Sequence, residues 1–143
     1  MRKVGLFFGS FNPPHIGHAI IARRAQEQFK LDEVQFIVSP HNPFKNKKSL
    51  APSDVRLNLV KIMCAEMNYE SNSKELGDKF YASNIEFELS QPSYTSETLR
   101  FLENRNKTQN VLKEKYYIIM GADCLSQIDE WKDYDYIIKN FQI

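Results

Sequence analysis

Histidine, glycine and proline gather in one short segment near the amino terminus, residues 9–18, with the sequence GSFNPPHIGH. His15 and His18 are three residues apart, so on the first turn of a helix they point to the same side. A helix N-terminus attracts phosphate through its unpaired N–H groups and its dipole. Two imidazoles at that place can donate further hydrogen bonds to phosphate oxygens. The segment therefore predicts a phosphate-binding site.

The two glycines of this segment have separate expected roles. Gly9 lets the chain turn sharply after a strand and brings backbone N–H groups close to a ligand. Gly17 has no side chain, so a nucleotide can lie against the surface between the two imidazoles. Two other interpretations of the histidines stay open, an ordinary helix-capping pair and a metal site. The chain contains neither the G-x-G-x-x-G fingerprint nor the P-loop pattern.

Two more segments with polar side chains follow predicted strands. Residues 39–45, SPHNPFK, follow the apolar run 34–38, and residues 121–123, GAD, follow the run 116–120. All three histidines of the chain fall in the first two of the three post-strand segments, His41 being the third histidine. Ligands of open α/β sheets bind at the carboxyl ends of the strands. We therefore expect these segments to form one site.

The hydrophobic pattern predicts alternating strands and helices. Strands are expected at 4–8, 34–38, 82–89 and 115–120, and helices at 16–29, 53–67 and from 95 or 96 to about 105, with loops at 40–48 and 68–79. Ile16, Ala19 and Ile20 share one side of the first helix. In the second helix, Val55, Leu59, Ile62 and Met63 recur at helical spacing. The fold class is α/β, a Rossmann-like, mostly parallel sheet with helices on both faces.

Size and charge narrow the class of protein. The chain has 143 residues, which predicts a single domain over 1–143. Its formal net charge of +1 argues against a nucleic-acid partner. It shows no apolar run long enough to cross a bilayer and no signal-peptide pattern, so no membrane partner and a cytoplasmic location are expected. Cys64 and Cys124 are expected to be reduced thiols.

The first segment resembles the nucleotidyltransferase signature G-G-T-F-D-P-x-H-x-G-H. Phe8 stands in place of the first glycine, Ser10 in place of the threonine and Asn12 in place of the aspartate. Three further segments, 39–45, 92–99 (PSYTSETL) and 120–123 with Trp131 after it, follow in the order found in the nicotinate-nucleotide adenylyltransferases. Together the four segments span residues 4–138, so nearly the whole chain resembles this family.

The resemblance implies an enzyme of NAD synthesis, whose substrates are ATP and nicotinate mononucleotide and whose products are deamido-NAD and pyrophosphate. The residues it assigns to catalysis are His15, His18 and Lys45. Those it assigns to ATP are Gly9, Ser10, Phe11, His15, Gly17 and His18. Those it assigns to the mononucleotide are Asn12, His41, Lys45, Tyr94, Thr95, Asp123 and Trp131. It further implies Mg²⁺ held mainly by substrate phosphates and water, with no dedicated metal ligands.

The nicotinate end has its own expected chemistry. Backbone N–H groups at the start of the helix near Thr95 can receive the pyridine carboxylate. Trp131 offers its face to the pyridinium ring. Each of three residues also has a plainer interpretation: Trp131 as a core anchor, Asp123 as a helix cap and Tyr94 as a packed aromatic.

One expected segment is missing from the sequence. The family usually continues with an Ile-Ser-Ser-x-x-[IV]-R segment that grips ATP phosphates. Its absence predicts a chain shortened at the C-terminus, with an incomplete ATP site and marginal stability. Two other functions stay open: adenylyl transfer to another acceptor, such as nicotinamide mononucleotide or phosphopantetheine, and nucleotide binding without catalysis. The oligomeric state is left open as well.

Overall fold

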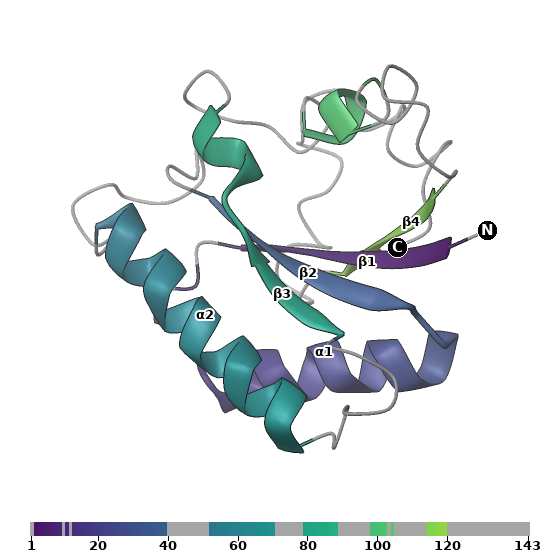
Figure 1. Ribbon diagram of the computed structural model, residues 1–143, viewed down its shortest axis with the longest axis horizontal. Coiled ribbons are helices and arrows are strands. Elements are labelled where there is room, and N and C mark those ends of the chain that lie inside the picture. Colours follow the sequence, from purple (N-terminus) through teal and green to yellow (C-terminus); the bar gives the residue numbers. More distant parts are fainter. Residues whose placement is uncertain are drawn as a thin grey trace.

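Among the residues that the structure describes, the framework is a four-stranded parallel sheet (Figure 1). The computed structural model describes residues 2–9, 11, 13–39, 52–70, 79–88, 98–102, 104 and 114–119. Its elements are β1 (Arg2–Gly9), α1 (Ile16–Phe29), β2 (Glu33–Val38), α2 (Ser53–Glu70), β3 (Phe80–Ser83), the 3₁₀ helix η2 (Ile85–Glu88) and β4 (Glu114–Ile119). Residues 98–102 are also helical. The predicted α/β class and the predicted bounds of the first helix are confirmed.

The strand order is β3-β2-β1-β4, and every neighbouring pair is parallel. Along the chain, β2 and β3 are therefore added on one side of β1, and β4 is added on the other side. A ligand crevice forms at such a reversal point in open α/β sheets. β1 ends between the ends of β2 and β4, and the amide of Ser39 extends the pairing by donating to the carbonyl of Gly9 at 2.9 Å.

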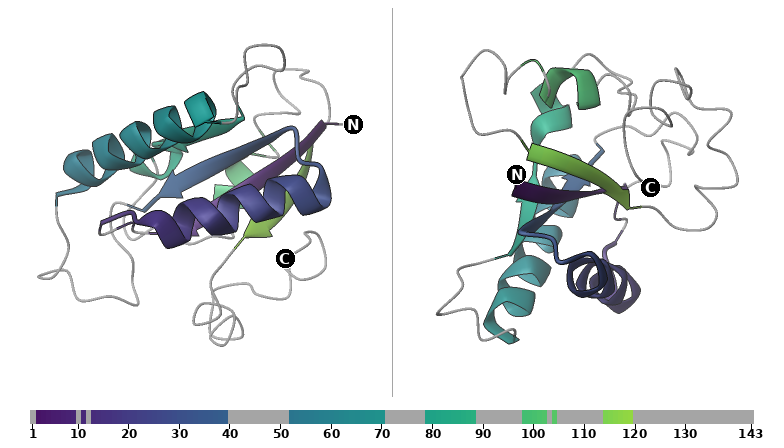
Figure 2. Two further views of the ribbon diagram at one scale, coloured as in Figure 1. Left: turned by 90° about the horizontal axis from the view of Figure 1, so that it is seen from below. Right: turned by 90° about the vertical axis from the view of Figure 1, so that its right-hand side faces the viewer.

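Alternating side chains of the strands build two separate cores. In β1, Val4 and Leu6 face one cluster, whereas Phe7 faces the other. The cluster around Phe7 is covered by α1 and α2, and the cluster around Leu6 is covered by η2 and the helical residues 98–102. Figure 2 shows these two groups of helices on opposite faces of the sheet. Helices on both faces were predicted, and they are confirmed.

The strand predicted at 82–89 is wrong in its bounds. β3 ends at Ser83, and η2 takes the next residues. The Ser83 hydroxyl accepts a hydrogen bond from the amide of Ile85 at 3.3 Å, and the amide of Phe87 donates to the Asn84 carbonyl at 2.9 Å. Serine and asparagine favour such local turns over a continued ladder. Ile85 and Phe87 are therefore placed on a tight helical turn.

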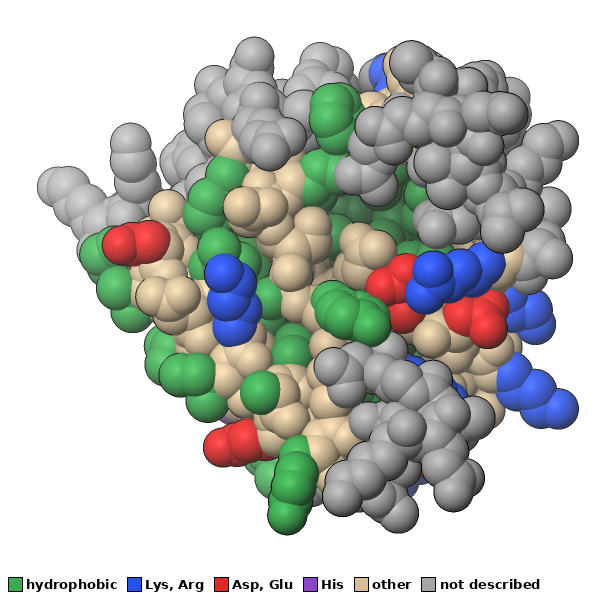
Figure 3. Space-filling model, in the orientation of Figure 1, with side chains coloured by type: hydrophobic (Ala, Val, Ile, Leu, Met, Phe, Trp, Pro, Cys, Tyr) green, Lys and Arg blue, Asp and Glu red, His purple; other side chains and the backbone are tan. Residues whose placement is uncertain are grey.

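The helix faces predicted from apolar spacing are only partly correct. In α2 the buried apolar side chains are Leu57, Val60, Cys64 and Met67, and Met63 packs against them. Val55, Leu59 and Ile62 of the predicted face are exposed, Ile62 by 57%. Figure 3 shows hydrophobic side chains on the outer surface along α2. In α1, Ile16 is 77% exposed, and the residues that pack on the sheet are the alanines Ala19, Ala22 and Ala25. Small side chains let a helix lie close to a sheet, and they decide the packing face here.

Several expectations fall outside the described residues: most of the loops at 40–48 and 68–79, the start of the helix at 95 or 96, and Cys124. Of the helices that are described, none is long and apolar enough to cross a membrane.

Burial of Cys64 makes the stability sensitive to alkaline pH. Burial raises the pKa of this thiol to about 12, from its ordinary 9.0. As the pH rises above 9, the unfolded chain loses the thiol proton while the folded chain keeps it, so stability is lost progressively between these two values. The maximum slope from this group is about 1.4 kcal/mol per pH unit. Denaturant unfolding between pH 8 and about 10 should show a steeper loss for the wild type than for Cys64→Ala. Equal slopes would contradict the assignment.

Candidate functional site

The N-terminus of α1 is capped by two imidazoles. His15 is the N-cap residue, and its Nδ1 accepts a hydrogen bond from the amide of Gly17 at 3.0 Å. His18 stands at the third helical position, and its Nδ1 accepts from the amide of His15, also at 3.0 Å. This is a capping box in which histidines replace the usual hydroxyl and carboxyl groups. The capping interpretation of the pair is thus correct for these two nitrogens.

The same bonds fix which ring nitrogen carries the proton. A nitrogen that accepts a backbone N–H bond has no proton of its own, so each neutral ring is protonated at Nε2. The two rings are stacked, with centroids 3.9 Å apart and planes 29° from parallel. The two imidazole rings therefore lie side by side at the N-terminus of α1, as their spacing in the sequence predicted.

Both Nδ1 atoms are engaged by the backbone, so neither can bind a metal. Within the described ranges, no group of three or more His, Cys, Asp or Glu side chains could hold a metal ion.

Aromatic packing holds the His18 ring in place. Its ring meets that of Phe11 edge-on at 5.0 Å and that of Phe7 at 5.9 Å. Phe11 is only 2% exposed, so what it can offer a ligand is its backbone. Its φ of 51° is left-handed, which is uncommon for a residue with a side chain. The sharp turn expected at Gly9 therefore lies at Phe11, and Gly9 instead makes room: a Cβ there would lie 3.1 Å from the Phe11 ring.

Gly17 is required by the cap itself. A Cβ at this position would lie 2.7 Å from Cε1 and 2.9 Å from Nδ1 of His15. Real Cβ atoms do not approach other atoms so closely, so the ring would have to move and its bond to the amide would be lost. This is a local reason for a glycine, in addition to the room for a nucleotide that the sequence suggested.

A buried arginine that the sequence pattern did not single out lies next to this edge. Arg56, in the first turns of α2, is 1% exposed, and its Nη1 donates to the carbonyl of Ser39 at 2.6 Å. Desolvation lowers its pKa from the ordinary value. It shares the buried helix face of Val60 and Met67, at spacings of four and eleven residues, which was a readable signal. The bond joins α2 to the point where the chain leaves β2 for residues 40–51.

Many of the predicted site residues lie outside the described part of the chain: Ser10, Asn12, His41, Lys45, Tyr94, Thr95, Asp123 and Trp131. Their roles stay predictions. The described residues do bring together Gly9, Phe11, His15, Gly17 and His18 at the carboxyl edge of β1. β2 and β4 flank β1, so the polar segments that follow all three strands leave the sheet from the same edge.

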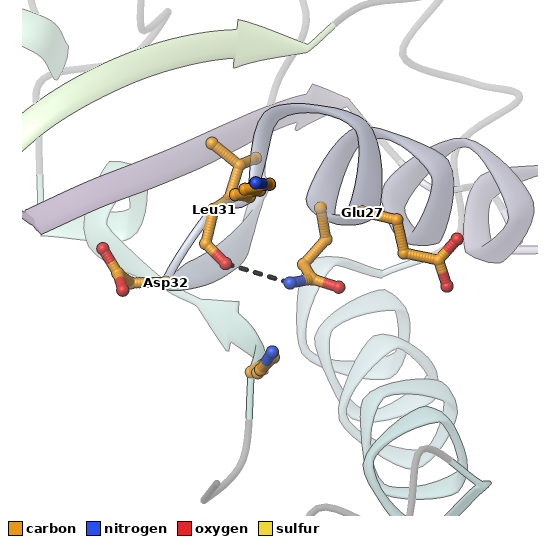
Figure 4. Close-up of a pocket in the computed structure, with 6 residues that line it drawn as sticks. Glu27, Leu31 and Asp32 are labelled. Carbon is orange, nitrogen blue, oxygen red and sulfur yellow. Dashed lines mark hydrogen bonds between the residues drawn. The ribbon is translucent and has the colours of Figure 1, made fainter.

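A cavity of about 490 Å³ lies at the opposite end of the sheet, where α1 ends and β2 begins (Figure 4). Two of its polar side chains, those of Gln26 and Asp32, make hydrogen bonds within the fold. The Gln26 side-chain amide donates to the carbonyl of Leu31 at 3.1 Å, and the Asp32 carboxylate accepts from the amide of Lys3 at 2.7 Å. This cavity therefore belongs to the connection between α1 and the sheet.

A groove of about 420 Å³ runs between α1 and α2, with His15 among its lining residues. Ile16, Ile20, Leu59 and Ile62 give it a largely apolar wall. Arg23 and Glu66 also line the groove, so its wall is apolar apart from His15 and these two side chains of opposite charge.

Comparison with known proteins places the chain among nucleotidyltransferases. The family model described as "Cytidylyltransferase-like" matches residues 6–143. Two relatives named "Probable nicotinate-nucleotide adenylyltransferase", from Christiangramia forsetii and Flavobacterium psychrophilum, are 42% and 41% identical to the chain. Each is matched over 99% of this chain, which spans 66% and 65% of their lengths, slightly less than two thirds.

A solved structure has the same fold. It is "Plasmodium falciparum nicotinic acid mononucleotide adenylyltransferase complexed with NaAD", with a TM-score of 0.73 and 17% identity. The match covers 94% of this chain and 59% of that one. The Rossmann-like nucleotidyltransferase fold expected from the sequence is confirmed.

The clash at Gly17 predicts an unusual sign for a helix substitution. Glycine to alanine inside a helix ordinarily stabilises a protein by about 0.5 to 1 kcal/mol. Gly17→Ala should instead destabilise by up to about 1 kcal/mol, because a lost cap costs up to about 2 kcal/mol and outweighs the alanine gain. In a His15→Ala background the ring is gone, and the same substitution should become stabilising. Chemical denaturation of the four proteins measures both effects. A stabilising Gly17→Ala in the wild-type background would contradict this account of the cap.

Proposed function

This chain belongs to the cytidylyltransferase-like family, and we propose that it transfers the adenylyl group of ATP to nicotinate mononucleotide, giving deamido-NAD and pyrophosphate. The observation that carries the proposal is the pair of stacked, Nε2-protonated imidazoles at the reversal point of a parallel sheet. The names of the two relatives support the choice of acceptor.

The proposed reaction requires stabilisation of negative charge on the transferring phosphoryl group. A phosphate oxygen of the mononucleotide forms a bond to the α-phosphorus of ATP. The bond from that phosphorus to the bridging oxygen breaks, and pyrophosphate leaves with the electron pair. The nucleophile is already an anion, so no general base is needed. Catalysis then consists of holding two anionic groups in line and stabilising charge on the transferring phosphoryl group.

The imidazole pair suits this task. Each Nε2–H can donate a hydrogen bond to a phosphate oxygen, and the backbone bonds to Nδ1 hold both rings before the substrate arrives. Donors that are already in position need no reorganisation during the reaction, which is what makes them effective. His18, held against Phe7 and Phe11, is the one we assign to the α-phosphate.

The remaining roles follow the family resemblance. Lys45 and His41 would hold phosphate charge, and backbone groups near Gly9, Ser10 and Phe11 would contact ATP. Asn12, Tyr94, Thr95, Asp123 and Trp131 would bind the mononucleotide. ATP would bring Mg²⁺ on its own phosphate oxygens, where the ion offsets negative charge.

Two substitutions separate capping from catalysis. Asparagine is a favoured N-cap, and glutamine is the usual partner at the third position of a capping box. His15→Asn and His18→Gln should therefore keep the melting temperature close to that of the wild type. His18→Gln should lower kcat about a hundredfold or more, as for one lost transition-state donor. A coupled pyrophosphate-release assay, together with thermal melts, measures both. Normal kcat in His18→Gln would remove His18 from the proposed chemistry.

The acceptor itself is tested by comparing acid and amide. A carboxylate at a helix N-terminus gains charge-assisted hydrogen bonds from backbone N–H groups, whereas an amide turns its NH₂ toward donors and leaves at least one unpaired, at about 1 to 3 kcal/mol. Nicotinate mononucleotide should be preferred over nicotinamide mononucleotide at least about tenfold in kcat/KM. Pyrophosphate release with ATP and each acceptor, phosphopantetheine included, measures this. Equal rates would contradict the chosen acceptor, and binding without release would favour a module without catalysis.

A further inference from the structure

We propose that Arg56 is a positioning residue for His18, acting through the carboxyl ends of β2 and β1 and through the ring of Phe11. The inference rests on the proposed function, which assigns the Nε2–H of His18 to the α-phosphate of ATP. A donor is effective at that place only while its ring is held in one orientation. Four contacts between described residues connect the guanidinium to this ring.

The first contact joins α2 to the end of β2. Nη1 of Arg56 donates to the carbonyl of Ser39 at 2.6 Å, and the two residues are 1% and 9% exposed. Hydrogen bonds from a charged group that is shielded from water are among the strong ones in proteins. Arg56 therefore fixes the position of the residue that directly follows β2.

The second contact joins the end of β2 to the end of β1. The amide of Ser39 donates to the carbonyl of Gly9 at 2.9 Å, one residue beyond the point where Gly9 lies opposite Val38 in the parallel pair. Ser39 thus accepts a hydrogen bond from α2 and donates one to β1. Because one residue makes both bonds, a displacement of Ser39 relative to α2 changes the position of the end of β1.

The third and fourth contacts are made by the Phe11 ring. It lies against Gly9, where a Cβ would be 3.1 Å from the ring, and it meets Phe7 of β1 and Phe36 of β2 at centroid distances of 5.5 Å. Residues of both strands therefore form the seat of this ring. The same ring meets that of His18 edge-on at 5.0 Å, so the seat of Phe11 sets one wall of the space that His18 occupies.

Apolar packing keeps α2 in place without the guanidinium. Leu57, Val60 and Met67 are buried in the same cluster as Phe11 and Phe36. Loss of the guanidinium should therefore leave α2 docked on the sheet. The change should fall on the carboxyl edge of the sheet, where the seat of Phe11 becomes less well defined.

The orientation of the His18 ring can be read without substrate from the ¹⁵N resonances of its two ring nitrogens. A ring held with its proton on Nε2 gives two well-separated resonances, and exchange between the two tautomers brings them together. Arg56→Met keeps an apolar side chain and removes the donors, so it should reduce this separation. Phe11→Leu should reduce it as well. The double variant should go no further than Phe11→Leu alone, because both changes act along one route.

Kinetics and a matched control separate positioning from a general structural role. In pyrophosphate release by the 143-residue chain, Arg56→Met should lower kcat about tenfold and leave both KM values within about twofold, because the misplaced donor acts in the transition state. Glu33→Gln is the control. It removes a buried charge that pairs with Arg2 at 3.1 Å, at the other end of β2. It should lower the melting temperature and leave kcat and the His18 resonances unchanged.

The outcomes are distinct. An unchanged ¹⁵N separation in a folded Arg56→Met protein would overturn the proposal, and so would an equal reduction in Glu33→Gln, which would indicate general loosening of the sheet. If Arg56→Met does not fold, Arg56→Lys replaces it, because lysine keeps the charge without the planar fork. A smaller reduction is then expected, and no reduction would overturn the proposal. A wild-type chain without turnover would contradict the proposed function, and the ¹⁵N resonances would still decide whether Arg56 positions His18.

Discussion

The site depends on two backbone N–H groups at the start of α1, which have no partner within the helix. Imidazole nitrogens satisfy both the amide of Gly17 and the amide of His15. From these two bonds follow the stacking of the rings, the position of their protons and the need for a glycine between them. Phe11 and Phe7 complete the arrangement from the sheet side, so the cap and the core of the domain are packed as one unit.

The strand order of the sheet determines where the histidine cap is placed. The chain adds β2 and β3 on one side of β1 and β4 on the other, so the carboxyl end of β1 lies between those of β2 and β4. A buried arginine strengthens this edge, since Arg56 binds the carbonyl of Ser39, whose amide binds Gly9. The proposed reaction needs phosphate-binding donors from several segments, and the carboxyl ends of neighbouring parallel strands are where such segments can converge.

Much of the fold could be predicted because its signals are local and strong. The apolar runs fixed β1, β2 and β4 to within a few residues, and α1 has the predicted bounds. Spacing could not tell which stripe of a helix packs, because α1 docks through alanines and leaves Ile16 exposed. Alternation could not tell a strand from the turn that Ser83 starts. The histidine pair was found from sequence, but its bonds through Nδ1, and the burial of Arg56, depend on atomic positions that no pattern encodes.

Capping and phosphate binding are compatible roles for the same two side chains, because an imidazole has nitrogens on both sides of its ring. If the cap alone were needed, serine or asparagine would supply it with less demand on the neighbours. The histidine cap requires Gly17, because a Cβ there would lie 2.7 Å from the His15 ring. A serine cap would avoid this requirement, and it would provide no Nε2–H donor. The requirement for Gly17 is explained if the cap serves to hold two Nε2–H groups at the edge of the sheet, with helix stability as the lesser benefit.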